Sequence, residues 1–177
     1  MIERPEFSRV FRVDQIPAAG VEHDLTADEA ERAALARRFG ILAVDTLTAR
    51  IRLKAIAGGT MVRLHGSLSA DVVQACVVTL EPVPAHIEED FELTFGEAEA
   101  EDGGEIELSM DDSDPPDPIV NGTVDVGEAV AEHLALALDP FPRKAGATVP
   151  ASAQAELPAE EKPNPFAVLA QLRQKKE

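Results

Sequence analysis

The clearest pattern in the chain is an alternation of apolar and polar residues in two neighbouring runs. Apolar residues or glycine occupy every second position over residues 47–55 and again over residues 62–68. A period of two is typical of a strand that buries one face. Gly58 and Gly59 between the runs predict a two-residue turn, because glycine accepts a positive φ. The pattern therefore predicts a β-hairpin.

Two further strands are predicted directly after this hairpin. The first covers roughly Asp71–Leu80, an apolar, β-branched run that holds the only cysteine, Cys76. The second follows the break at Pro82 to Pro84 and covers roughly His86–Phe95, where apolar and acidic residues alternate. Four consecutive antiparallel strands predict a meander curled into a barrel-like sheet. Burial among apolar neighbours raises the pKa of a thiol, so we interpret Cys76 as an inert core residue.

Two helices are predicted, each beginning with a capping box. Thr26 and Glu29 form the first box, and the following run is rich in the strong helix formers Ala, Glu and Arg. Asp125 and Glu128 form the second box, ahead of a wide apolar stripe. His133 lies in that stripe, and we interpret it as a hydrogen-bonded core or boundary residue. Both helices are expected to pack against the sheet.

These elements predict one α+β domain over residues 1–144, with an antiparallel, barrel-like sheet, two packed helices and a first strand over Phe7–Val13. Within it, residues 96–118 have the acidic composition, with Gly and Pro, of a flexible loop. Residues 145–163 form a linker rich in Ala, Pro and Glu. Residues 164–177 are predicted to form a C-terminal helix tethered by that linker.

The C-terminal helix is predicted to begin at Asn164 and Pro165, residue types that are favoured at the N-cap and the first helical position. Its apolar face is made by Phe166, Leu169 and Leu172. A helix of about twelve residues is marginal in isolation. We therefore expect these three residues to dock, either on this chain or on a partner.

The net charge of −17 is concentrated in the middle of the chain. Residues 1–63 carry ten Lys or Arg and nine Asp or Glu, whereas residues 64–142 carry twenty Asp or Glu and no Lys or Arg. Residues 143–177 carry six basic and four acidic residues. Because an anionic segment repels phosphate, the middle of the chain favours a basic protein partner. Any contact with RNA would have to come from outside this segment.

Two groups of basic residues are candidates for such a contact. One lies on the polar side of the first predicted helix, and it also fits an ordinary solvated helix face. The other lies on the face of the hairpin opposite the core, where it could contact either RNA or the protein's own acidic segment. Both alternatives stay open here. The candidate RNA-binding residues are Arg37, Arg38, Arg50, Arg52, Lys54 and Arg63.

The sequence carries no recognisable motif for catalysis, nucleotide binding or metal binding. A single cysteine excludes an internal disulfide, and the acids at 111–117 lack the glycine and the distal glutamate of a calcium loop. We therefore predict no catalytic residue, no metal, no cofactor and no small-molecule substrate. No apolar run is long enough to cross a membrane, and the start lacks the apolar core of a signal peptide. A cytoplasmic protein without a membrane partner is expected.

The order of four motifs resembles a known family. QACVVTLEPVP begins at Gln74, an acidic strand and loop follow, VDVGEAVAEHLALALDPFP begins at Val124, and NPFAVLAQL begins at Asn164. Over about residues 20–172 this order is similar to the YceD family, which is named for large ribosomal RNA subunit accumulation. The resemblance implies a non-enzymatic ribosome biogenesis factor that binds large-subunit rRNA or a basic ribosomal protein. The alternatives are a binding module or chaperone for a basic partner unrelated to the ribosome, and an enzyme with an unrecognised site.

The resemblance also bears on metal binding. Many family members carry a Cys-x-x-Cys pair where this chain has Cys76 to Thr79, and further cysteines where it has residues 142–146. Four thiolates would form a structural zinc site. This chain retains one cysteine, so the resemblance implies that packing replaces the metal here.

Overall fold

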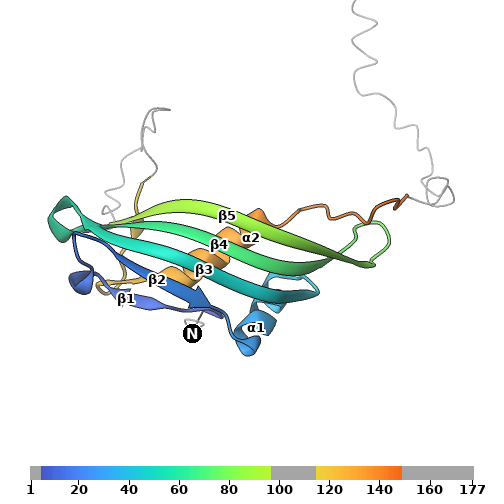
Figure 1. Ribbon diagram of the computed structural model, residues 1–177, viewed down its shortest axis with the longest axis horizontal. Helices are drawn as coiled ribbons and strands as arrows, with labels where there is room; N and C mark the ends of the chain where they lie inside the picture. Colours follow the sequence, from blue (N-terminus) through green and yellow to red (C-terminus); the bar gives the residue numbers. More distant parts are fainter. Residues whose placement is uncertain (1–4, 97–114, 149–177) are drawn as a thin grey trace, which may run out of the picture. The chain divides into compact units, whose positions relative to one another are not determined.

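The computed structural model describes residues 5–96 and 115–148 of the chain (Figure 1). The elements below all lie within residues 1–144, which form one compact unit. Within the described ranges, no helix is long and apolar enough to cross a membrane. The predicted C-terminal helix and most of the predicted acidic loop lie outside the described residues.

The main sheet has five strands in the order β2-β3-β4-β5-β6. The first four are consecutive and antiparallel: β2 (Val21–Thr26), β3 (Ala43–Ile56), β4 (Met61–Ala75) and β5 (Pro82–Gly96). The two-residue strand β6 (Asp117–Pro118) runs parallel to the end of β5. The predicted antiparallel meander is confirmed for β3 to β5, but two of its four predicted strands form the single strand β4. Sequence reasoning missed β2 and β6.

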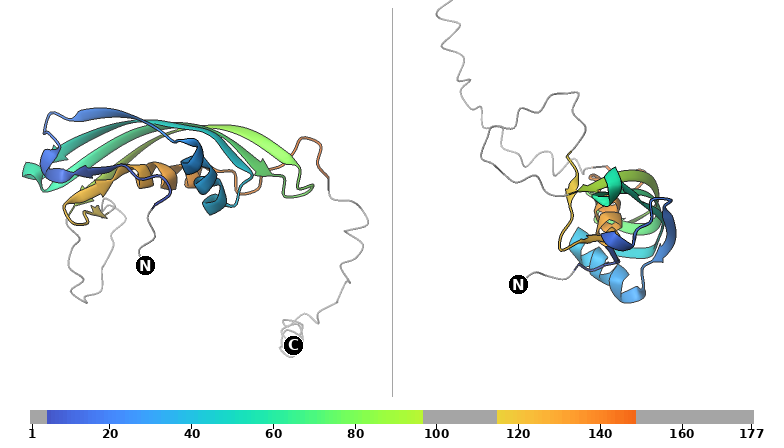
Figure 2. Two further views of the ribbon diagram at one scale, coloured as in Figure 1. Left: turned by 90° about the horizontal axis from the view of Figure 1, so that it is seen from below. Right: turned by 90° about the vertical axis from the view of Figure 1, so that its left-hand side faces the viewer.

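Both helices cover one face of this sheet: α1 (Glu29–Phe39) and α2 (Val126–Ala137). Figure 2 shows the sheet arching over them. The core lies between these two layers, where alternate residues of β3 and β4 are almost inaccessible; Ile51, Leu53 and Leu64 are completely buried. The predicted α+β class is therefore confirmed. The sheet curves without closing, so it is barrel-like only in this loose sense.

The first helix begins two residues later than predicted. Asp28, not Thr26, is the N-cap: its side chain accepts from the amide of Glu31, and the Glu31 carboxylate accepts from the amide of Asp28. Thr26–Glu29 and Asp28–Glu31 both have the residue types and the three-residue spacing of a capping box. Thr26 is instead the last residue of β2, held in register with Thr48 of β3.

The second helix begins where predicted, but only the Asp125 side of the predicted capping box forms. The Asp125 carboxylate accepts from the amides of Gly127 and Glu128, at 3.1 and 3.3 Å. The Glu128 carboxylate does not complete the box and accepts from the guanidinium of Arg38 on α1.

A second sheet joins the two ends of the domain. β1 (Val10–Arg12) pairs antiparallel with β7 (Thr123–Asp125). The predicted first strand is therefore shorter than the Phe7–Val13 range, and Phe7 is buried outside it. The amide of Val126 donates to the carbonyl of Arg9 at 3.1 Å, so this sheet also fixes the start of α2.

Two predicted turns differ from the observed ones. The β3–β4 connection has four residues, 57–60, instead of two, and begins with the 3-10 turn η2 (Ala57–Gly59). The strand predicted over Asp71–Leu80 ends at Ala75, as the second half of β4. Residues 76–80 form a turn because the amide of Leu80 donates back to the carbonyl of Cys76 at 2.9 Å.

Candidate partner-binding face

The strands β2 to β5 expose one polar surface on the side of the sheet opposite the helices, which we call the outer face. It is formed by the residues that alternate with the buried ones. Its charged members are Glu22, Asp24, Arg50, Arg52, Lys54, Arg63, Asp71, Glu88, Asp90 and Glu92.

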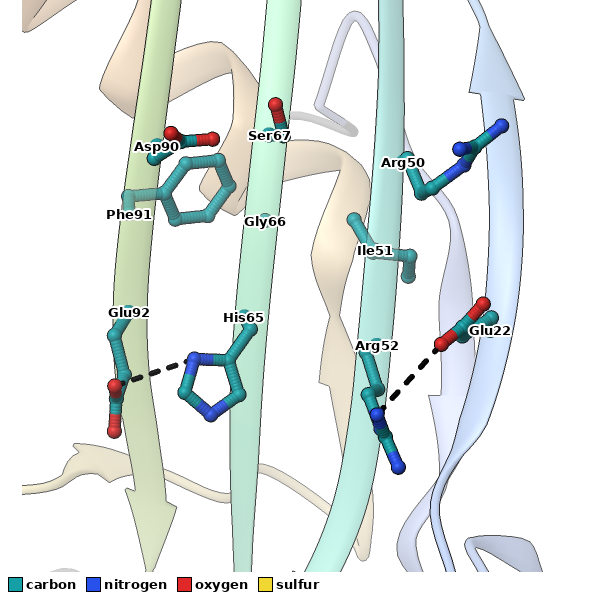
Figure 3. Close-up of a pocket in the computed structure, with 10 residues that line it drawn as sticks. All are labelled: Glu22, Arg50, Ile51, Arg52, His65, Gly66, Ser67, Asp90, Phe91 and Glu92. Carbon is teal, nitrogen blue, oxygen red and sulfur yellow. Dashed lines mark ion pairs between the residues drawn. The ribbon is translucent and has the colours of Figure 1, made fainter.

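The strand register places these charges in rows across the sheet. One row runs from Glu22 through Arg52 and His65 to Glu92, with each residue directly opposite the next. Figure 3 shows the two ion pairs in this row: Arg52 Nη1 lies 3.8 Å from Glu22 Oε1, and His65 Nδ1 lies 3.2 Å from Glu92 Oε2. The basic residue of β3 therefore lies between acidic residues of β2 and β5.

The same arrangement recurs at the neighbouring arginines. Arg50 Nε donates to Asp24 Oδ1 at 2.9 Å, and this hydrogen bond raises the pKa of Arg50. Arg63 Nε lies 3.2 Å from Glu92 Oε1. The alternation correctly predicted that Arg50, Arg52, Lys54 and Arg63 share this face. The acidic partners of the three arginines come from β2 and β5 at the same face: Asp24 and Glu22 lie directly opposite Arg50 and Arg52, and Glu92 lies diagonally across from Arg63.

Two shallow hollows lie along the middle of the outer face. The first, of about 510 Å³, lies between Arg52 and Glu22 on one side and His65 and Glu92 on the other (Figure 3). The second, of about 740 Å³, includes Ser69 and further hydroxyl and acidic residues. The hollows present side chains of both charge signs and hydroxyls, which suits polar contacts with a macromolecule.

The RNA-binding candidates Arg37 and Arg38 of α1 and Lys54 of β3 differ in their contacts. Arg38 is an internal link: its guanidinium donates to both oxygens of Glu128 on α2, at 2.9 and 2.6 Å, and to Glu6 at 3.1 Å. These contacts, above all the one with Glu128, raise the pKa of Arg38. Within the described residues Arg37 and Lys54 make no ion pair. The docking candidates Phe166, Leu169 and Leu172 lie outside the described residues.

We expect the Arg38–Glu128 pair to couple the two helices by about 1 kcal/mol, because the pair is bidentate but about a third exposed. A double-mutant cycle with Arg38→Met and Glu128→Gln, followed by urea unfolding, measures this coupling. The exposed Arg12–Asp14 pair provides the comparison, and its coupling should be near zero. Equal coupling in the two cycles would contradict a structural role for Arg38.

Sequence reasoning missed the role of Arg9. Its guanidinium donates to both carboxylate oxygens of Glu31, at 2.7 and 3.0 Å, and lies 4.5 Å from the centre of the Phe7 ring. It also donates to the carbonyl of Thr26 at 3.1 Å. Arg9 therefore joins residues 5–12, which we call the N-terminal arm, to the start of α1. No local sequence pattern indicates this contact.

Cys76 is buried as predicted, but its environment differs from the predicted one. The amide of Lys144 donates to Cys76 Sγ at 3.4 Å. This hydrogen bond and one from the Thr79 hydroxyl lower the pKa of Cys76 to about 6. The predicted rise in its pKa was therefore wrong, because the Lys144 amide and donors in the turn after β4 point toward the sulfur.

These residues do not fit a structural zinc ion. The turn offers a single thiolate, and the groups around it are a backbone amide and the Thr79 hydroxyl, which donate hydrogen bonds. Lys144 Nζ lies near the same turn, 2.8 Å from Glu81 Oε1. In the part of the chain that the structure describes, no three Cys, His, Asp or Glu side chains are grouped for metal binding. The turn is joined to residues 142–144 by hydrogen bonds instead.

The Cys76 thiol should titrate with a midpoint near pH 6 in the folded protein, measured as thiolate absorbance at 240 nm. Because the folded pKa lies below the unfolded value, the thiolate adds stability that is complete above the unfolded pKa and is lost as pH falls toward 6. Thr79→Val should raise the midpoint, and Cys76→Ser should remove this part of the pH dependence. A midpoint near 9 in the folded wild-type protein would contradict the assignment.

On the inner face, His133 of α2 lies at the boundary of the core, as predicted. Its Nδ1 lies 3.0 Å from Glu89 Oε1 of β5, and its ring stacks on Phe91 at 4.1 Å between centroids. Nearby, the pKa of Glu132 is raised by burial and by the charges of Glu128 and Asp117. Arg38 and His133 act on the Glu132 pKa in the opposite direction.

The fold and this face define a small α+β domain whose exposed sheet surface carries ordered rows of opposite charges. Residues 64–173 match the model of the family described as large ribosomal RNA subunit accumulation protein YceD. Because this match covers more than half of the chain, the protein belongs to the YceD family. The family name ties it to accumulation of the large-subunit ribosomal RNA. No curated protein and no solved structure showed significant similarity to the chain.

Proposed function

We propose that this protein is a non-enzymatic assembly factor of the cytoplasm that supports large-subunit rRNA accumulation by binding a basic segment of a ribosomal protein. The observation that carries this proposal is the pairing on the outer face. Arg50, Arg52 and Arg63 each lie against a carboxylate of the same sheet. These three arginines and Lys54 form what we call the basic column, and the three arginines are neutralised within the protein. Among the described residues, no Lys or Arg lies against the acids Asp71, Glu88 and Asp90 of the same face, although His86 lies beside the first two.

The charge balance of the outer face favours a cationic partner over RNA. The face carries four Lys or Arg and six Asp or Glu, and the acids flank the basic column on both sides. A phosphate backbone would have to displace Asp24 or Glu92 and then lie beside the remaining acids. A lysine- or arginine-rich segment meets Glu88 and Asp90 directly. Direct rRNA contact through the unpaired Arg37 and Lys54 is the competing mechanism.

The test is crosslinking of the full-length protein in growing cells, followed by identification of bound protein and RNA, with and without nuclease. We expect one large-subunit ribosomal protein to be captured in nuclease-resistant form, and the reversal Arg50→Glu, Arg52→Glu, Lys54→Glu, Arg63→Glu to leave that capture intact. Capture of rRNA that is salt-sensitive and lost in the reversal variant would overturn the proposal in favour of rRNA binding. A parallel capture without residues 164–177 tests the predicted docking residues Phe166, Leu169 and Leu172.

A further inference from the structure

The edge strand β5 directs alternate backbone groups away from the sheet. It pairs with β4 from Pro82 to Phe95 without a bulge. The carbonyl of Glu81 accepts from the amide of Cys76 on the β4 side at 2.8 Å, whereas the carbonyl of Gly96 accepts from the amide of Ile119 on the opposite side at 2.8 Å. Successive residues of a strand direct their backbone groups to opposite sides. The odd-numbered residues of β5 therefore bond to β4, and the even-numbered ones point to the free edge.

Most of this edge is open within the described residues. β6 pairs with Phe95 and Gly96 alone, and no other described strand lies beside residues 82–94. Pro82 and Pro84 occupy even positions, where the missing amide hydrogen removes no bond to β4. The part that can accept another strand therefore runs over residues 86–94. Its outward backbone groups belong to His86, Glu88, Asp90, Glu92 and Thr94.

The residues with outward backbone groups also carry the acidic side chains. Glu88, Asp90 and Glu92 are exposed on the outer face. Like charges placed directly opposite one another destabilise strand pairing, so two copies of this edge repel each other. A strand that carries Lys or Arg at alternate positions meets a carboxylate at the three central outer positions, of which Glu92 is shared with Arg63 and His65.

We propose that the β5 edge takes an extended Lys- or Arg-rich segment of the partner protein as an added strand of the main sheet. The inference rests on the proposed function and specifies where and how the basic segment binds. The outer side chains of the added strand face Glu88, Asp90 and Glu92. Its inner side chains lie beside Ile87 and Leu93, which are half-buried at the edge. Backbone hydrogen bonds supply affinity, and the alternating side chains supply specificity.

Amide hydrogen exchange of the full-length protein tests the mode of binding. The probe is a blocked nine-residue peptide in which Lys and Val alternate. At saturation, the amides of Glu88, Asp90 and Glu92 should exchange about tenfold more slowly, because each gains a hydrogen bond. The amides of Glu89 and Phe91 already bond to β4 and should change little. Unchanged exchange at the even-numbered amides under saturating peptide would overturn the proposal.

Two N-methylated peptides separate strand addition from general charge attraction. One is methylated at the Lys amides and the other at the Val amides, so the two have the same charge and the same side chains. Methylation at Lys blocks antiparallel addition and methylation at Val blocks parallel addition, because the two ladders use opposite sets of amides. We expect the Kd of one peptide alone to rise about tenfold or more. Equal affinity of the two peptides would contradict addition to the edge.

Matched charge variants locate the site. Glu88→Gln with Asp90→Asn should weaken peptide binding about tenfold at low salt. Glu29→Gln with Asp45→Asn changes the net charge equally at exposed positions away from β5 and should leave the Kd unchanged. Equal weakening by both pairs would overturn the assigned site.

If the peptide binds as expected but no ribosomal protein is crosslinked, the edge site stands and the proposed function fails. If a ribosomal protein is crosslinked equally by the Glu88/Asp90 variant, the function stands and the edge site fails.

Discussion

Gly127→Ala should lower the free energy of unfolding by about 2–3 kcal/mol, although alanine is the better helix former. A Cβ at this position of α2 would lie 2.6 Å from the carbonyl oxygen of Phe7 and 2.7 Å from the amide nitrogen of Arg9. These are backbone atoms, and they cannot move separately from the arm. The arm is itself held by Asp125, which accepts from Ser8 Oγ at 2.6 Å and from the Arg9 amide at 2.7 Å.

Urea unfolding followed by circular dichroism measures this effect. The sign of the change in the free energy of unfolding is informative, because a glycine-to-alanine change at an unhindered helix position stabilises the protein by about 0.5–1 kcal/mol. Leu136→Ala, at an exposed position of the same helix, should change stability little and serves as the control. Wild-type or higher stability of Gly127→Ala would show that the arm does not lie against α2 as described.

Gly66→Ala should cost a similar amount, about 2–3 kcal/mol, for a different reason. Gly66 lies directly opposite Phe91 in the β4–β5 ladder, and the Phe91 ring covers the glycine. An added Cβ would lie 2.3 Å from the end of the ring. The ring cannot retreat without cost, because it stacks on His133, whose Nδ1 is bonded to Glu89. A glycine covered by a cross-strand aromatic ring is a known stabilising pair in sheets.

The effect of Gly66→Ala should reverse sign when Phe91 is replaced by leucine. Leucine lacks the ring atoms that the new Cβ would meet, so in Phe91→Leu the alanine should stabilise the strand by about 0.5–1 kcal/mol. Urea unfolding of the four proteins of this cycle measures both signs. An equal loss in the two backgrounds would place the cost of the alanine somewhere other than the Phe91 ring.

The sequence predicted well the elements whose pattern repeats over many residues. The alternation over residues 47–68 placed the core face and the basic column correctly. A one-residue slip in register would bury the four charges of that column, so the alternation determines the register. Short signals were less reliable. Thr26–Glu29 and Asp28–Glu31 satisfy the same capping rule, and the choice depends on β2 extending to Thr26 along β3. The pairing of β2 with β3 is a tertiary contact, so a local capping rule does not contain it.

The features that sequence reasoning missed depend on residues far apart in the chain. The turn at Cys76 forms where an apolar run suggested a strand, because the amide of Val77 donates to the carbonyl of Pro142 and not to a neighbouring strand. The low pKa of Cys76 follows from the Lys144 amide, which lies 68 positions away. On the outer face, the acidic partners of Arg50 and Arg52 could have been found by pairing β2 with β3, but β2 was not recognised.

The pairing of β1 with β7 also constrains how the protein is made. Residues 10–12 leave the ribosome before the other described strands of the domain, and their partners, Thr123–Asp125, leave after all of them. Strands β2 to β5 pair with sequence neighbours and can form during synthesis, whereas the arm must wait until α2 has emerged. Until then, the inner face of the nascent sheet lacks α2, one of the two helices that cover it. A pause in translation before Asp125 would therefore prolong exposure of apolar surface to chaperones or to aggregation.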